Sequence, residues 1–143
     1  MANFFKDVVE HVKQKFLHAQ RDSQTGGKRS PHWKKVRKDF LKQHRTCVIC
    51  GTKSGLQVHH KKPFHLYPEL ELDLTNLITV CMSFRRHCHL KIAHGGNFIS
   101  YVPEINKLIN ISKGKAEKFD ELVSYARNHR IISKSYGSFK DFN

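Results

Sequence analysis

The sequence predicts a single α+β domain in which two short strands and several helices surround a cluster of cysteines and histidines. Three observations lead to this prediction. Apolar residues recur with helical spacing in several segments, one segment alternates in polarity, and another is typical of a strand that pairs with it. All four cysteines and six of the eleven histidines fall between Cys47 and His94. A chain of 143 residues has room for one modest core, so we expect one domain over residues 1–143.

Two helices are predicted in the N-terminal part of the chain. The first covers roughly residues 3 to 19, where the apolar side chains form one stripe. The second begins near Ser30 and Pro31, because serine caps free N–H groups and proline is tolerated at a first helical position. Its apolar face includes Trp33 and Phe40, and lysines occupy most of the remaining positions.

The central stretch predicts two antiparallel strands followed by a short helix. Residues 55–60 alternate in polarity and precede Pro63, and residues 76–80 form the second strand. The helix begins at His87 or Cys88 and ends at Gly95 and Gly96, which favour a helix C-terminus. Two more apolar stripes predict helices over residues 103–111 and 114–129.

The charge of the chain predicts a polyanionic partner. There are 26 Lys and Arg against 12 Asp and Glu, a formal net charge of +14, and residues 1–46 carry the largest share. Nucleic acid is the first candidate and an anionic membrane surface the second. The sequence has no apolar run of about 18 residues and no secretory cleavage pattern, so we expect an intracellular protein. In that setting clustered cysteines favour metal ligation over disulfides.

The cysteines predict a structural zinc site. Cys47 and Cys50 have the two-residue spacing of a zinc knuckle, and Gly51 relieves the backbone of the turn. Cys81 and Cys88 form the second pair, with His87 as the alternative fourth ligand. A closed site of this kind contributes folding free energy of order 10 kcal/mol in small domains.

The histidines predict hydrolytic chemistry. Cleavage of a phosphodiester needs a base to activate water and a cation to stabilise developing charge. His59 and His60 stand at a strand end and point to opposite sides, so one ring can bind a metal while the other faces the water. His89, on the following helix, is placed to supply another metal ligand.

These motifs together resemble the HNH endonuclease family over roughly residues 30 to 96. The resemblance implies a ββα-metal finger, two antiparallel strands and a helix around one divalent cation, braced here by zinc and flanked by helical segments at 1–29 and 97–143. It implies that His60 is the general base, that Asn76 braces the loop between the strands, and that His89 binds the metal. His59 stands at a ligand position, and His94 is a candidate third ligand.

The sequence departs from the family pattern in the second knuckle. Phe84 stands where a cysteine is expected, and we interpret the following residues as a four-residue insertion before Cys88. Contacts with the DNA backbone are predicted for eight basic residues: Lys34, Lys35, Lys38, Lys61, Lys62, Arg85, Arg86 and Lys91.

The resulting prediction is a metal-dependent endonuclease that hydrolyses DNA, nicks one strand and has low sequence specificity. The family uses Mg²⁺ or Mn²⁺, whereas several imidazoles favour Ni²⁺, Mn²⁺ or Zn²⁺. One alternative is a zinc-ribbon module that binds nucleic acid without catalysis. Another is the nuclease subunit of a phage packaging or recombination complex. A homodimer or a phage packaging protein is the expected protein partner, in the cytoplasm of a bacterium or a phage-infected host.

Overall fold

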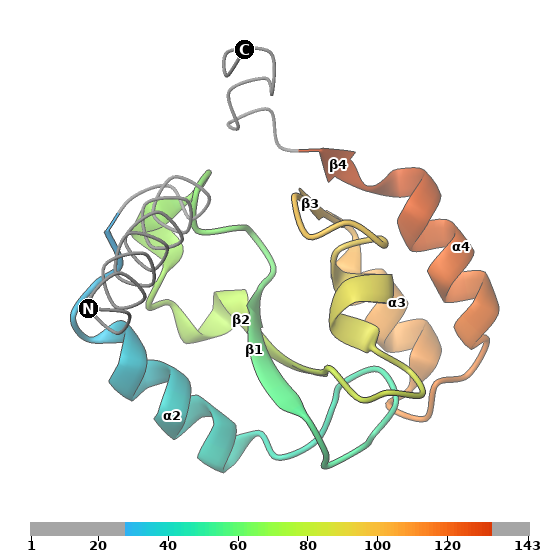
Figure 1. Ribbon diagram of the computed structural model, residues 1–143, viewed down its shortest axis with the longest axis horizontal. Coiled ribbons are helices and arrows are strands. Elements are labelled where there is room, and N and C mark those ends of the chain that lie inside the picture. Colours follow the sequence, from blue (N-terminus) through green and yellow to red (C-terminus); the bar gives the residue numbers. More distant parts are fainter. Residues whose placement is uncertain (1–27, 133–143) are drawn as a thin grey trace, which may run out of the picture.

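A computed structural model describes residues 28–132, so the helix predicted over residues 3 to 19 lies outside the described part of the chain. The described elements form an α+β fold (Figure 1). The helices are α2 (Trp33–Gln43), α3 (Ile105–Ser112), α4 (Phe119–His129), the π-helix η3 (His89–Ala93) and the short 3-10 turns η1 (Pro68–Leu70) and η2 (Leu74–Asn76). The strands are β1 (Leu56–His60), β2 (Leu77–Cys81), β3 (Ser100–Tyr101) and β4 (Ile131–Ile132).

The centre of the fold is the antiparallel hairpin of β1 and β2. Leu56 pairs with Cys81 at one end, and His60 pairs with Leu77 at the other. The two strands predicted over residues 55–60 and 76–80 are therefore confirmed within one residue. The pairing places the adjacent histidines and the last β2 cysteine at opposite ends of the hairpin.

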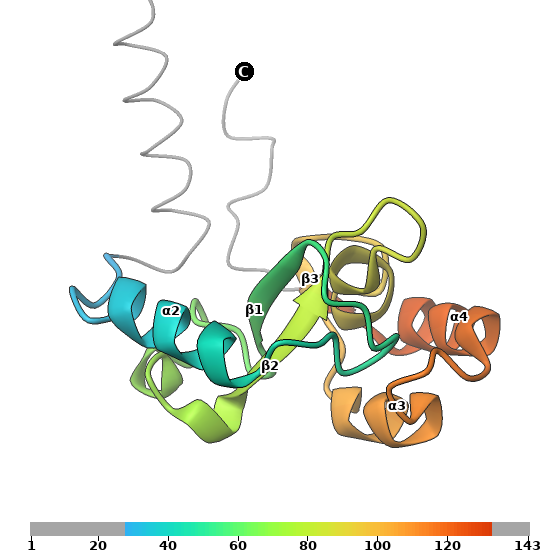
Figure 2. The same ribbon diagram turned by 90° about the horizontal axis from the view of Figure 1, so that it is seen from below.

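The hairpin separates two hydrophobic cores of unequal size. On one face Val58 and Leu77 pack with Phe40 of α2. On the other face Ile78 and Val80 join a larger core with η3, α3 and α4. Figures 1 and 2 show α2 on one side of the hairpin and α3 and α4 on the other. Alternation of side chains along each strand thus directs neighbouring residues into different cores.

Two predicted helices begin later than the sequence suggests. The chain turns at residues 30–32 before α2, and the hydroxyl of Ser30 accepts from the amide of His32 at 3.2 Å instead of capping the helix. The start predicted at residue 114 is wrong because α4 begins at Phe119. The amide of Ala116 donates to the carbonyl of Ile49 at 2.8 Å, so this segment closes onto the cysteine turn instead of forming a helical turn.

The C-terminal flank contains a strand pair that the sequence pattern did not predict. Ser100 pairs with Ile132 and Tyr101 with Ile131. Two-residue strands are too short to show alternation, so only tertiary contact reveals them. In residues 28–132, every helix is too short or too polar to cross a bilayer.

Candidate metal centres and active site

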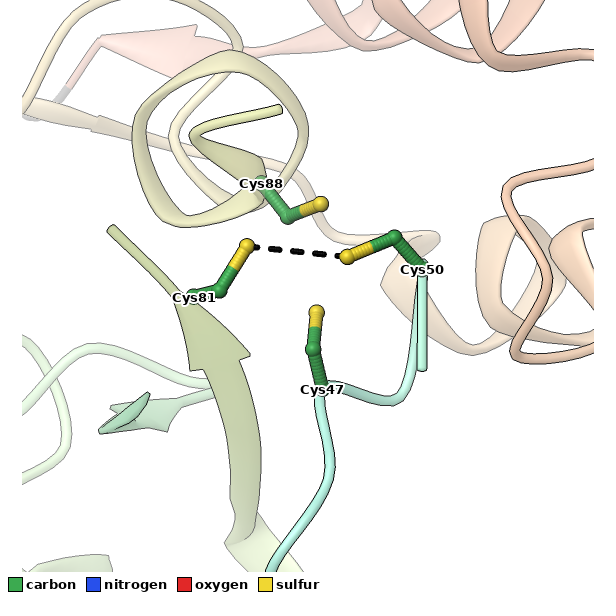
Figure 3. Close-up of side chains that lie close together, drawn as sticks. All are labelled: Cys47, Cys50, Cys81 and Cys88. Atoms are coloured by element: carbon green, nitrogen blue, oxygen red, sulfur yellow. Dashed lines mark hydrogen bonds between the residues drawn. The ribbon is translucent and has the colours of Figure 1, made fainter. Parts of the chain in front are cut away.

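The four cysteines come together in one cluster. Cys47 and Cys50 lie on the turn after α2, Cys81 ends β2, and Cys88 directly precedes η3. Their sulfur atoms lie within 4.8 Å of one another and point toward a common centre (Figure 3). Sγ of Cys50 is 3.7 Å from Sγ of Cys81. Two thiolates bound to one tetrahedral zinc at about 2.3 Å each are roughly 3.8 Å apart, so the cluster has the size and donor set of a closed zinc site.

The thiols alter one another's ionisation. A side-chain hydrogen bond with Cys88 is the main cause that lowers the pKa of Cys47 to about 5. The same hydrogen bond, followed by burial, raises the pKa of Cys88, and burial raises the pKa of Cys50 to about 11. The protein groups alone therefore favour one thiolate over its neighbours. A bound divalent cation would stabilise the thiolate form of all four cysteines. The cluster therefore has the donors that a metal site requires.

The long spacing in the second knuckle is absorbed by a loop. After Cys81 the chain runs outward through Phe84, which is fully exposed, and returns through His87. His87 has a left-handed φ of 50°, a conformation that turns the chain sharply. This turn brings the sulfur of Cys88, and not the ring of His87, into the cysteine cluster. The structure thus favours Cys88 over His87 as the fourth donor.

A second cluster consists of three imidazoles. The ligand nitrogens of His59, His89 and His94 lie within 4.8 Å of one another. His59 comes from β1 and is only 5% exposed, whereas His89 is the first residue of η3 and His94 directly follows its last residue. Burial is the main cause that lowers the pKa of all three rings, and that of His89 falls to about 3. The rings are therefore neutral near pH 7, which is the form that binds metals.

The π-helical winding of η3 brings His89 and His94 together. Side chains five residues apart are about 140° apart around a regular α-helix, because each residue turns it by about 100°. In η3 the amide of His94 donates to the carbonyl of His89 at 3.0 Å, a bond across five residues. This wider turn returns His94 to the same side as His89, and such turns often occur at functional sites.

The hydrogen bonds of His94 fix its lone pair toward the cluster. Its Nδ1 lies 2.6 Å from the carbonyl oxygen of Ser100, which can only accept, so Nδ1 carries the proton. Nε2 is then free of hydrogen and lies 3.2 Å from Nε2 of His89. Two nitrogens bound to one tetrahedral ion at about 2.0–2.1 Å are roughly 3.3 Å apart. The geometry and the tautomer both fit a cation held between these rings, with Ser100 in a supporting role.

His60 faces the opposite side of β1 from His59. Its ring is 4.6 Å from the Trp33 ring, measured between centroids, and is 8% exposed. Nε2 of His60 donates to the carbonyl oxygen of Glu71 at 2.9 Å. Burial lowers the pKa of His60, so the ring is neutral near pH 7 and its basic nitrogen is Nδ1. A neutral, oriented imidazole is the form required of a general base.

Asn76 ties the two strand ends together through its side chain. Its Oδ1 accepts from the amide of Lys62 at 2.8 Å, and its Nδ2 donates to the carbonyl of Lys62 at 3.0 Å and to that of Leu70 at 3.4 Å. The residue is 5% exposed. The clamp holds the segment that follows His60, and it has the geometry of the bracing role predicted for Asn76.

Changing Asn76 to aspartate is expected to lower the free energy of unfolding by about 1–3 kcal/mol. The substitution keeps the acceptor for the Lys62 amide but places a carboxylate against two carbonyl oxygens. Chemical denaturation would measure the change. Asn110→Asp, at an exposed position of α3, is the matched control and should differ little from the parent protein. Equal stability of Asn76→Asp and the parent would contradict the clamp.

Sequence reasoning missed three residues that support the site. Trp33 was assigned only to a helical face, yet it packs on His60. The carbonyl groups of Glu71 and Ser100 orient His60 and His94. The Glu71 carboxylate is itself buried and accepts from the amide of Ser30 at 2.9 Å. Every residue has a backbone carbonyl group, so the sequence does not show which carbonyl groups accept these hydrogen bonds.

The predicted DNA-contacting residues lie in four places. Lys34, Lys35 and Lys38 are exposed on α2, where Lys35 also pairs with Asp39 at 2.6 Å. Lys61 and Lys62 directly follow His60, and Lys91 is exposed on η3. Arg85 and Arg86 lie on the loop beside the cysteine cluster, and the guanidinium of Arg86 is 4.8 Å from the centroid of the Phe119 ring. Contact of these groups with DNA stays a prediction.

Comparison with known proteins gives one family match. The model of the HNH endonuclease family matches residues 47–95, about a third of the chain. Neither the curated proteins nor the solved structures contain a match to the chain. The matched segment runs from the first cysteine through the hairpin to the residue after His94 and so includes both clusters. Residues 47–95 are thus similar to the HNH endonuclease family, and this similarity suggests nuclease-type activity on DNA.

Proposed function

We propose that this protein is a metal-dependent endonuclease that hydrolyses DNA phosphodiester bonds. The observation that carries the proposal is the position of His60 on the strand that also supplies one ring of the three-imidazole cluster. His59 faces His89 and His94, with ring centroids 5.2 and 4.7 Å away, while His60 faces Trp33. A binding module without catalysis has no use for a neutral, oriented base beside a second metal centre.

Each site residue has a separate role in the proposed reaction. His60 takes a proton from the attacking water at Nδ1, since its Nε2 is occupied by the carbonyl of Glu71. His59, His89 and His94 would hold a divalent cation, which when bound would stabilise the negative charge that develops during hydrolysis. Asn76 keeps the strand end in place during these steps. By the family resemblance, the expected products carry 5′-phosphate and 3′-hydroxyl ends.

The ligand set bears on the choice of cation. Three neutral imidazoles suit Ni²⁺, Mn²⁺ or Zn²⁺ better than Mg²⁺, which prefers oxygen ligands. The cysteine cluster, in contrast, offers four sulfur donors and suits zinc. We propose that the two centres therefore hold different metals, with a structural role for the first and a catalytic role for the second.

One site of this kind cuts one strand, so the proposed product is a nick. A break in both strands requires a homodimer or a partner such as a phage packaging protein. The proposed unit is the whole chain, residues 1–143, with the core at 30–96. Its affinity for DNA would come mainly from contacts of lysine and arginine with phosphate groups. Such contacts contribute little sequence specificity.

Removal of the lysine charges on α2 is expected to weaken the salt dependence of DNA binding. In Lys34→Gln/Lys35→Gln/Lys38→Gln, the slope of log K against log salt should fall by about 0.9 for each phosphate that a lysine no longer neutralises. Fluorescence anisotropy at several salt concentrations measures the slope. The control is Lys113→Gln/Lys115→Gln/Lys118→Gln, which makes the same charge change on the turn between α3 and α4. Equal slopes in both triple variants would exclude α2 from the DNA interface.

The proposed function is tested by nicking of supercoiled plasmid. The protein is treated with a chelator that removes weakly held metal, and Mg²⁺, Mn²⁺, Ni²⁺ or Zn²⁺ is then restored one at a time. Nicking that requires the added metal supports the endonuclease. DNA binding without cleavage under every metal would contradict it and favour either the zinc-ribbon binding module or a subunit that acts only with its partners.

A further inference from the structure

A cavity of about 410 Å³ lies next to the candidate active site and is not used by the proposed mechanism. It opens between the segment after β1 and the segment that joins β3 to α3. Its lining residues are drawn from both segments and include Lys61, Lys62, Tyr67, Asn76, Tyr101 and Asn106.

Two chain connections link this cavity to the site. Lys61 directly follows His60, the proposed base. Tyr101 directly follows Ser100, whose carbonyl accepts from the ring of His94 at 2.6 Å. A third link is Asn76, which lines the cavity and clamps the backbone of Lys62. The lining of the cavity is therefore continuous in the chain with residues that hold His60 and His94 in place.

The lining combines aromatic rings, positive charge and amide groups. Tyr67 and Tyr101 are both half-buried in the lining, and burial, followed by the neighbouring Tyr67, raises the pKa of Tyr101. Nζ of Lys62 lies 5.4 Å from the centroid of the Tyr67 ring. Asn106, exposed on the first turn of α3, carries a donor and an acceptor at the rim. Aromatic faces stack on bases, lysines bind phosphate, and an amide side chain pairs with a base edge.

The size of the cavity excludes a duplex. Its volume falls within the range of small-molecule sites, roughly 300–1,000 Å³. A nucleobase with its sugar fits such a space, whereas a base pair within a helix does not enter it. A bare phosphate site would not need two tyrosines, and Asp73 in the lining would oppose it.

We propose that this cavity binds the nucleobase of an unpaired nucleotide adjacent to the scissile phosphate. The inference rests on the proposed nuclease function and adds a substrate class to it. The base stacks on Tyr67 and Tyr101, and Lys61 and Lys62 contact the flanking phosphates. The protein then prefers single strands, bulges or forked ends over fully paired DNA.

Binding measurements test the cavity without any cleavage. Two duplexes are compared that differ only in one 2-aminopurine, which is bulged in one and paired in the other. His60→Ala serves as the parent, because it is expected to bind DNA without cutting it. The parent should bind the bulged duplex about tenfold tighter, the order expected for one base–aromatic stack, and should quench the 2-aminopurine fluorescence. Equal affinity for the two duplexes would overturn the proposal.

Variants of the two tyrosines locate the effect. Tyr67→Leu/Tyr101→Leu in the parent should reduce the preference to less than about twofold, whereas Tyr67→Phe/Tyr101→Phe, which keeps both rings, should retain most of it. Tyr125 lies on α4 and stacks on His129. The variant Tyr125→Leu is therefore the control and should leave the preference unchanged. An unchanged preference in the double leucine variant would overturn the proposal.

A replacement variant and a separate nicking assay distinguish the remaining outcomes. If the double leucine variant does not fold, as judged by circular dichroism, Asn106→Ala at the exposed rim replaces it and should reduce the preference severalfold. Plasmid nicking by the wild-type protein is measured separately. Absence of nicking with a retained preference for the bulge would reject the nuclease and keep the base-binding cavity, and nicking without that preference would do the reverse.

Discussion

Replacing His60 with alanine is expected to reduce plasmid nicking by about 10²–10⁴-fold, the contribution that general base catalysis makes. His60 is the neutral ring oriented by the carbonyl of Glu71, and it lies outside the three-imidazole cluster. The variant should therefore retain both metals and bind DNA as tightly as the wild-type protein. Rates of nicking under saturating metal, measured with DNA affinity by anisotropy, check both halves of this expectation.

A matched variant separates the base from its structural contacts. His60→Gln places an amide where it can still donate to the Glu71 carbonyl, but it supplies no base, so it should be as inactive as His60→Ala. His129→Ala, at an exposed position of α4, removes a histidine that belongs to neither cluster and should cut normally. Nicking by His60→Gln within tenfold of the wild-type rate would show that another group accepts the proton.

Replacing Cys88 with serine is expected to release the zinc that we propose for the cysteine cluster and to unfold the domain. Structural zinc binding contributes about 10 kcal/mol or more, and the net stability of small domains is about 5–15 kcal/mol. Loss of one of the four ligands is therefore expected to remove most of the net free energy of unfolding. The cysteine cluster also joins the turn after α2, the end of β2 and the start of η3, so its loss should disturb the position of His89. Zinc content by mass spectrometry and thermal unfolding measure the result.

The control for this variant is the neighbouring histidine. His87 has a left-handed φ of 50°, and asparagine tolerates that conformation better than most residues. His87→Asn should therefore keep its zinc and unfold near the wild-type temperature. Loss of zinc from His87→Asn but not from Cys88→Ser would assign the fourth ligand to the histidine and contradict the arrangement of the cluster.

The local parts of the fold were largely predictable from residue pattern. Alternation identified the first strand of the hairpin, and the same alternation placed His59 and His60 on opposite faces. The spacing of Cys47 and Cys50 identified a knuckle, and Gly95 and Gly96, both with positive φ, end the short helix as expected. These features depend on residues that are close together in the sequence, so the sequence pattern predicts them.

Two features of the site depended on winding and loop geometry. A spacing of five residues separates His89 from His94, and only the π-helical bond between their backbones brings both rings to one side. Similarly, six residues separate Cys81 from Cys88, and only the outward loop with its turn at His87 returns the second thiol to the cluster. Residue spacing alone does not distinguish these arrangements from regular helix and strand.

Residue type alone established which chemical groups this protein offers: four thiols, a histidine pair, a bracing asparagine and a strong positive charge. Tertiary structure decided which of these groups act together and in what state. The carbonyl groups of Glu71 and Ser100 set the tautomers of His60 and His94, and β3 and α3 close a cavity beside the site. These backbone contacts and the cavity form where segments distant in the chain come together. Residue types along the chain do not reveal which segments will be in contact.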